Sequence, residues 1–210
     1  MTVKRRQFVA LCLGLPLVAL PRAAWHPALA AQVSPEGTVE SLHETLLGIM
    51  KRGSGLGPTQ RFDEILPKLD ALFDYTRMCR AIVGSAWSSA GEEDRKALVE
   101  AFAAMSAATY ASRFKSFSGE KFEIDGNRPG PRGLALVDTR IITSDGTPVP
   151  ITYVLRTDSS RWRLVDVLLD RGISELAVRR SEYNAILKES GIQGLTRVLR
   201  EKAEALLSGS

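Results

Sequence analysis

Histidine and cysteine, which often carry catalysis or bind metals, are scarce in this chain. The sequence contains His26 and His43, and Cys12 and Cys79. His26 and Cys12 lie in the first 30 residues, which we interpret below as a removable segment. The remaining His43 and Cys79 form no cluster with the ligand spacing of a zinc site, and a Ser-His or Cys-His nucleophile would have to use His43 alone. We therefore expect no histidine-dependent catalysis, no bound metal and no other cofactor.

Two local patterns resemble functional motifs only in part. His43 falls on the polar side of an amphipathic pattern, so we expect a lone surface histidine. Residues 53–57 read GSGLG, but no strand precedes them and no Gly-Lys-Ser/Thr follows, as a phosphate-binding loop requires. We interpret residues 53–57 as a flexible connection between helices.

Carboxylates in the middle of predicted strands allow one acid–base hypothesis. Asp138 or Asp166, beside a tyrosine such as Tyr110 or Tyr153, could move a proton next to a carbonyl group in a cofactor-free isomerase or lyase. The alternative is that both carboxylates form ion pairs across strands, which we favour. The candidate partners are Arg140, Arg156 and Arg163.

The first 30 residues have the composition of an export signal. Residues 4–6 are basic, residues 10–20 are apolar, and small residues precede a cleavage site after Ala30. The paired arginines also resemble a twin-arginine signal. The apolar run is shorter than the roughly 18 residues of a membrane span. We expect residues 1–30 to be removed and residues 31–210 to form a periplasmic protein.

Removal of this segment changes the charge balance. Four of the 28 Lys and Arg residues and none of the 24 Asp and Glu residues lie in residues 1–30, so the rest of the chain has 24 of each. Nucleic-acid binding needs clustered excess Lys and Arg, so we expect no nucleic-acid partner. Cys79 alone cannot form an internal disulfide. About 180 residues suffice for one core, and we expect a single domain and a monomer.

Hydrophobic spacing and capping signals predict helices in the first half of the chain. A helix should begin at Ser34 and Pro35 and end near Arg52. Further helices are expected over residues 60–66, ended by Pro67, over residues 69–83 with Cys79 on the apolar side, and from Glu92 to about Phe117. Ser89 and Glu92 have the spacing of a capping box. The last of these helices carries two adjacent apolar stripes, wider than contact with one flat surface requires.

Extended patterns follow Gly119. Four strands are expected over residues 121–125, 134–143, 149–157 and 162–170, and short loops between them favour an antiparallel sheet. Residues 164–169 are largely apolar on both faces, so we expect something to cover the second face. A C-terminal helical region from residue 174, interrupted at Gly191, could supply part of that cover. The predicted class is α+β, with helices packed over a curved four-stranded antiparallel sheet.

Several short motifs resemble the MlaC family, also called toluene-tolerance proteins, in their order and spacing along the chain. These are periplasmic phospholipid-binding auxiliary components of an ABC-transporter system that maintains outer-membrane lipid asymmetry. The resemblance covers residues 38–207. The residues that carry it are Phe73, Asp74, Trp87, Arg95, Phe102, Thr109, Tyr110, Ala111, Tyr153, residues 162–167 (WRLVDV), residues 172–174 (GIS) and residues 179–183 (RRSEY).

Two segments resemble a subgroup of this family called HpnM, which is associated with hopanoid biosynthesis and transport. These are residues 107–114 (AATYASRF) and 174–177 (SELA). The chain departs from the common family pattern around Gly172, where Asp170 and Arg171 precede the glycine and no aromatic-rich stretch follows. This departure weakens the inference of an identical ligand.

The resemblance implies an apolar lipid cavity, which would also explain the double stripe and the two apolar sheet faces. We expect a carrier that shuttles phospholipid or hopanoid between an inner-membrane transporter complex and an outer-membrane donor or acceptor. The expected pocket residues are Phe102, Met105, Tyr110, Phe114, Ile141, Tyr153, Leu155, Val165 and Val167. Besides the enzyme considered above, the alternative is an adaptor without lipid cargo that uses Arg179 and Arg180 as a contact.

Overall fold

The computed structural model describes residues 34–158, 161–169 and 172–208. The predicted export signal and the strand end at residue 170 lie outside these residues. Helices precede the sheet, and one long helix follows it. In chain order the elements are α2 (Pro35–Arg52), η1 (Gly53–Gly55), α3 (Pro58–Leu72), α4 (Tyr75–Val83), α5 (Ala86–Ser89), α6 (Glu92–Arg113), β1 (Lys121–Pro129), η2 (Pro131–Gly133), β2 (Leu134–Ile142), β3 (Pro148–Asp158), β4 (Arg161–Leu169), β5 (Ile173–Ser174) and α7 (Glu175–Ser208).

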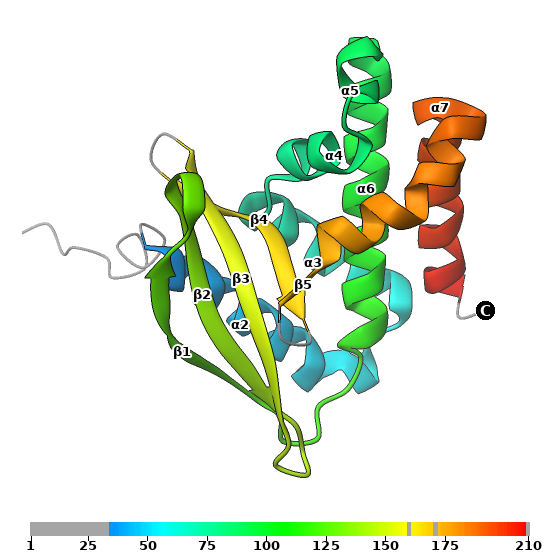
Figure 1. The fold of residues 1–210 in the computed structure, drawn as a ribbon. Coiled ribbons are helices and arrows are strands. Elements are labelled where there is room, and N and C mark those ends of the chain that lie inside the picture. Colours follow the sequence, from blue (N-terminus) through cyan, green and yellow to red (C-terminus); the bar gives the residue numbers. More distant parts are fainter. Residues whose placement is uncertain (1–33, 159–160, 170–171, 209–210) are drawn as a thin grey trace, which may run out of the picture.

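The predicted α+β class is confirmed, but the sheet has five strands rather than four. The antiparallel strands follow one another in the order β1-β2-β3-β4-β5. Strand β5 is only two residues long and pairs Ser174 with Leu168 and Ile173 with Leu169. The helical pattern begins immediately afterwards, and a strand of two residues is too short to show an alternating pattern in the sequence. Figure 1 shows the helices gathered on one side of the curved sheet.

The face of the sheet toward the helices belongs to the hydrophobic core. In β2 the residues Ala135, Val137 and Thr139 are buried and alternate with partly exposed ones. In β4 the alternation is broken by a bulge, because Val154 pairs with Asp166 while the next residue, Leu155, pairs with Leu164. A bulge adds one residue on one strand and so changes which side chains share a face.

This bulge accounts for part of the apolar run at residues 164–169, because the neighbouring residues Leu164 and Val165 are both buried there. The expectation that the C-terminal helical region could supply part of the cover of the second face is wrong. Helix α7 packs mainly against α6 and α4, and its residues Leu195 and Leu199 are buried in the same core as Val137 and Leu164.

Three helix boundaries differ from those expected. Helix α3 continues through Pro67, which is exposed, so water can satisfy the carbonyl that loses its helix partner. The chain becomes extended at Phe73, where Asp74 donates its N–H to the carbonyl of Leu164 at 2.9 Å. That contact divides the single helix expected over residues 69–83.

The long helix α6 begins after Gly91 rather than through a capping box. No side chain caps its first N–H groups, although the first turn is acidic. The helix ends at Arg113 instead of Phe117. By contrast, α2 begins as expected, because the Ser34 hydroxyl accepts the N–H of Gly37 at 2.9 Å.

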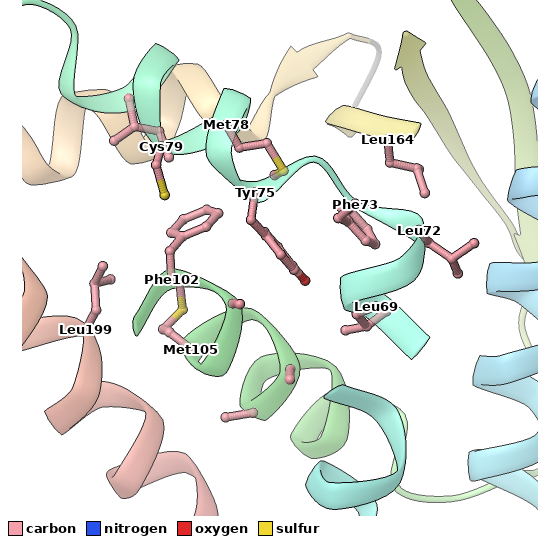
Figure 2. Packing of buried hydrophobic residues seen from close by; sticks show 14 of the residues in the cluster. Leu69, Leu72, Phe73, Tyr75, Met78, Cys79, Phe102, Met105, Leu164 and Leu199 are labelled. Atoms are coloured by element: carbon pink, nitrogen blue, oxygen red, sulfur yellow. The ribbon is translucent and has the colours of Figure 1, made fainter. Parts of the chain in front are cut away.

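The helical part of the core is aromatic and sulfur-rich. Figure 2 shows Phe73, Tyr75 and Phe102 converging between α4 and α6, with Cys79 on the α4 side. Cys79 is buried as expected, and burial raises the pKa of its thiol to about 12. A thiol in this state is not a nucleophile at neutral pH. The aromatic cluster therefore forms a rigid wall next to the space described below.

Candidate functional site

An apolar pocket of about 300 Å³ lies between α6 and the sheet. Helix α4 and the first turns of α7 complete its wall. The lining residues are Phe73, Met78, Phe102, Met105, Ser106, Thr109, Tyr110, Arg113, Phe114, Ile141, Val149, Ile151, Tyr153, Val167, Leu169, Glu175, Leu176 and Arg179. Its volume is at the lower end of the range for ligand pockets, roughly 300–1,000 Å³.

The α6 wall is built by residues three or four positions apart, which share one helix face. Tyr110 and Phe114 stack with ring centroids 5.7 Å apart, and Phe73 lies against Tyr110 at 6.1 Å. Tyr75 supports this wall from behind by donating its hydroxyl to Ser106 at 3.2 Å. In Figure 2, Phe102 and Met105 project from α6. These contacts hold large apolar side chains in place around the pocket.

The opposite wall follows the register of the sheet. Ile141 lies opposite Val149 on β3, and Tyr153 lies opposite Val167 on β4. Ile151 lies between the two pairs on β3, on the same face, because alternate residues of a strand point to the same side. These side chains therefore form one continuous apolar surface across three strands.

Seven of the nine residues expected in the pocket line it: Phe102, Met105, Tyr110, Phe114, Ile141, Tyr153 and Val167. The other two lie outside the lining. Leu155 is fully buried in the core, and Val165 falls within the β4 bulge, which breaks the two-residue period that had grouped it with Val167. Contact of any of the nine with a lipid stays a prediction.

Sequence reasoning missed the polar edge of the pocket. Arg113, at the end of α6, and Glu175 and Arg179, one turn apart at the start of α7, join the lining. Burial raises the pKa of the Tyr110 hydroxyl, the Arg113 charge lowers it, and the Glu175 charge raises it. No local pattern links Arg113 to a helix that begins about 60 residues later, so only the fold brings these charges together.

The strand carboxylates proposed for acid–base chemistry lie outside the pocket lining. Asp138 pairs with Arg128 at 2.9 Å and accepts the Thr152 hydroxyl at 2.7 Å. Although partial burial opposes it, these bonds and the Arg128 charge leave the Asp138 pKa below its usual value. The expected ion-pair role is therefore confirmed for Asp138, although its partner is Arg128 and not an arginine of the expected set.

Asp166 has no arginine partner among the residues that the structure describes, and it instead joins β4 to the start of α7. It accepts the Val167 N–H at 2.8 Å, the Ser174 hydroxyl at 2.6 Å and the Leu176 N–H at 3.1 Å. Such bonds to N–H groups of a first helical turn act as a cap. The ion pair expected with Arg140, Arg156 or Arg163 is wrong for Asp166, because its carboxylate oxygens accept these N–H and O–H donors instead.

Arg140 and Arg163, two of the three arginines expected to pair with these carboxylates, have other partners. Arg140 pairs with Glu123 and Asp125 of β1, at 2.8 and 3.1 Å. Arg163 donates to the carbonyls of Asp70 and Phe73. Arg163 thus fixes the junction between α3 and α4 against the sheet.

The expectation that His43 is a surface residue is wrong. His43 is only 5% exposed, and its ring lies 4.6 Å from that of Phe122 and 5.5 Å from that of Tyr153. Its Nε2 atom has no hydrogen-bond partner within the described part of the chain, and burial lowers its pKa to about 4. His43 lies four residues after Val39 and three before Leu46, on the buried face of α2, and this spacing could have revealed its burial.

The described residues contain neither a metal-binding cluster nor a membrane-spanning helix. No group of three or more His, Cys, Asp or Glu side chains in that part of the chain is placed to hold a metal ion. None of the helices within residues 34–208, as far as these are described, combines the length and apolar character needed to cross a membrane.

The sequence matches the family model described as MlaC protein over residues 40–201. This match spans well over half of the chain. The chain belongs to the MlaC family. The solved structures include a similar MlaC-like fold, a phospholipid-binding protein from Ralstonia solanacearum determined in complex with a phospholipid. The two chains are 20% identical with a TM-score of 0.71, and the match covers 84% of this chain and 98% of the other.

Proposed function

We propose that this MlaC-family protein is a periplasmic lipid carrier that takes the apolar part of a phospholipid or hopanoid into the pocket between α6 and the sheet. The single observation that carries this proposal is the continuous apolar lining from α6, β2, β3 and β4. Membership of the family and the phospholipid-bound neighbour of similar fold support it. The resemblance of residues 107–114 and 174–177 to the HpnM subgroup is the reason to keep hopanoid as a cargo.

Energetics favour a protein pocket for such cargo. A two-chain lipid has about 30 methylenes, and leaving them in water costs about 20 kcal/mol at about 0.8 kcal/mol each. The membrane and the pocket both shelter the chains, so transfer between them can be nearly neutral. Direction must then come from partners, for which we propose an inner-membrane transporter complex and an outer-membrane donor or acceptor. Residues 1–30 would direct the chain to the periplasm, where residues 31–210 act as a monomer.

A charge placed in the lining tests the proposal. The protein and its Val167→Glu variant are incubated with phospholipid vesicles and repurified, and bound lipid is quantified by mass spectrometry. An unpaired carboxylate in an apolar site costs several kcal/mol, so we expect the variant to lose most of its lipid, by about tenfold or more.

The matched control is Val178→Glu, because Val178 is 36% exposed on α7 and does not line the pocket. This variant should keep its lipid. Circular dichroism and urea unfolding establish that both variants are folded. Full lipid retention by folded Val167→Glu would contradict the pocket assignment.

A further inference from the structure

Helix α7 consists of two parts that lie differently against the rest of the protein. It bends at Gly191, whose φ of 63° and ψ of −164° are not helical. Figure 1 shows the part before the bend (orange) crossing α6, whereas the part after the bend (red) runs alongside α6. We call residues 173–190, which comprise β5 and the part of α7 before the bend, the arm.

The arm has few buried side chains. Of residues 173–190, all of which the structure describes, Tyr183 alone is buried. After the bend, buried residues recur throughout residues 192–203. Helices α4 and α6, the other helical walls of the pocket, also contribute several buried residues to the core. A segment with so few buried contacts separates from the fold at a lower free-energy cost than its neighbours.

The two ends of the arm allow it to move as a unit. Strand β5 pairs with two residues of β4, and Asp166 accepts the Ser174 hydroxyl at 2.6 Å and the Leu176 N–H at 3.1 Å. A glycine with positive φ adjoins each end, Gly172 at 111° and Gly191 at 63°. Glycine changes its backbone angles at little steric cost, and hinges are a few such residues at the ends of elements. Once the bonds to β4 open, the arm can swing about Gly191 with Gly172 as a flexible tether.

The arm covers one side of the pocket. Glu175, Leu176 and Arg179 belong to the pocket lining, and Leu176 also packs against the hydrophobic core. The rest of the lining comes from α4, α6, the strands β2, β3 and β4, and Phe73. A swing of the arm away from the sheet would therefore uncover the pocket on this side while α6 and these strands stay in place.

Tyr183 anchors the arm, but its hydroxyl opposes the anchoring. The side chain is fully buried, and Lys202 from beyond the bend lies 5.5 Å from its ring centroid. No atom of the described residues lies in hydrogen-bonding geometry to the hydroxyl. Arg179 is close enough to lower the pKa of this hydroxyl against the effect of burial, but its guanidinium donates to Glu182 at 3.3 Å. A buried hydroxyl without a partner loses the hydrogen bonds that it makes in water. Opening of the arm returns it to water, so the hydroxyl favours the open state.

We propose that the arm is a lid that swings about Gly191 to admit and release cargo, and that Tyr183 is the positioning residue that holds the lid closed. The ring holds the lid on the core, and the unpaired hydroxyl keeps it from being held too firmly. This inference rests on the proposed lipid-carrier function. The lid sets how fast cargo exchanges rather than how tightly it is bound, because its closed state is favoured equally in the empty and the loaded protein.

Hydrogen exchange followed by mass spectrometry tests the lid without any lipid. In the protein expressed from its full sequence, we expect amides of residues 175–190 to exchange at least tenfold faster than those of residues 192–203. Tyr183→Phe removes only the unpaired hydroxyl and should slow exchange in residues 175–190 about tenfold. The matched control is Tyr75→Phe, because the Tyr75 hydroxyl on α4 has Ser106 as a partner. This control should leave the exchange of the lid unchanged.

The kinetics of cargo exchange test the role of the lid. The probe is phosphatidylglycerol with a pyrene-labelled acyl chain in phosphatidylglycerol vesicles, and its transfer to and from the protein is followed by the loss and return of excimer fluorescence. In Tyr183→Phe we expect uptake and release each to slow about tenfold, with the same amount of lipid bound at equilibrium. A role in stability alone would leave both rates unchanged.

Three outcomes would overturn the lid. The first is equal protection of residues 175–190 and 192–203 in the unmodified protein. The second is unchanged uptake and release in folded Tyr183→Phe. The third is a change in only one of the two rates, which would alter affinity and so indicate contact between Tyr183 and the cargo. Failure of the unmodified protein to take up any lipid would instead contradict the carrier function, while hydrogen exchange would still report on the movement of the arm.

Discussion

The burial of His43 predicts that acid weakens the fold through this one side chain. In the unfolded chain the imidazole has an ordinary pKa of 6.5, whereas burial against Phe122 and Tyr153 lowers the pKa to about 4 in the folded protein. Between these values the unfolded state binds more protons than the folded state. The contribution of His43 to the stability of the fold is therefore fully present above the unfolded pKa and is lost as the pH falls toward the folded pKa.

The size of the effect follows from the two pKa values. The difference of about 2.5 units corresponds to about 3 kcal/mol at the acid limit, at 1.36 kcal/mol per unit. About 2 kcal/mol of this is already lost at about pH 5, because protonation of the unfolded chain is nearly complete there. The Tyr153 ring does not add to the acid effect, since burial raises its pKa well above the usual value.

The assay is urea unfolding at neutral pH and at about pH 5 for the protein and for His43→Phe. Phenylalanine keeps an aromatic ring between Phe122 and Tyr153 but does not titrate, so the variant should lose about 2 kcal/mol less than the unmodified protein on acidification. Phe122→Leu serves as a control, because it weakens packing without changing a titratable group. Identical pH dependence in the protein and His43→Phe would refute this reasoning.

Two further substitutions test contacts that hold the fold together outside the pocket lining. In Gly53→Ala the new Cβ would lie 2.1 Å from the backbone oxygen of Lys115, so urea unfolding should show a loss of about 3 kcal/mol. Gly55→Ala, with nothing within 4 Å of its Cβ, should cost far less, and equal losses would contradict the clash. Asp166→Ala removes the acceptor of three hydrogen bonds and should lower the free energy of unfolding by about 2 kcal/mol. Lipid binding should survive in that variant at neutral pH, and a loss of binding without a loss of stability would show a direct role for Asp166 instead.

Local signals in the sequence were enough to locate most elements. Ser34 and Pro35 predicted the start of α2 because an N-cap hydroxyl and an N-terminal proline act within one turn. The hairpin strands β2 and β3 were predicted within two residues, since their alternation and turn residues are also local. Seven pocket residues followed from two periodicities, one on α6 and one on the sheet.

Features that depend on contacts between distant residues could not be predicted in this way. The bulge in β4 shifted Val165 out of the pocket face, and nothing in the local pattern marks it. Phe73 leaves the helical conformation because it meets Leu164, about 90 residues later. The polar edge of the pocket combines Arg113 with Glu175, and all five strands lie between these residues in the sequence, so no single segment contains the pattern.

The most direct test of the account is native mass spectrometry of the purified protein, followed by organic extraction and identification of the lipid. The account predicts about one phospholipid or hopanoid per chain, held between α6 and the sheet and released when the protein unfolds. Protein that is purified empty and takes up no lipid from vesicles would contradict the carrier function.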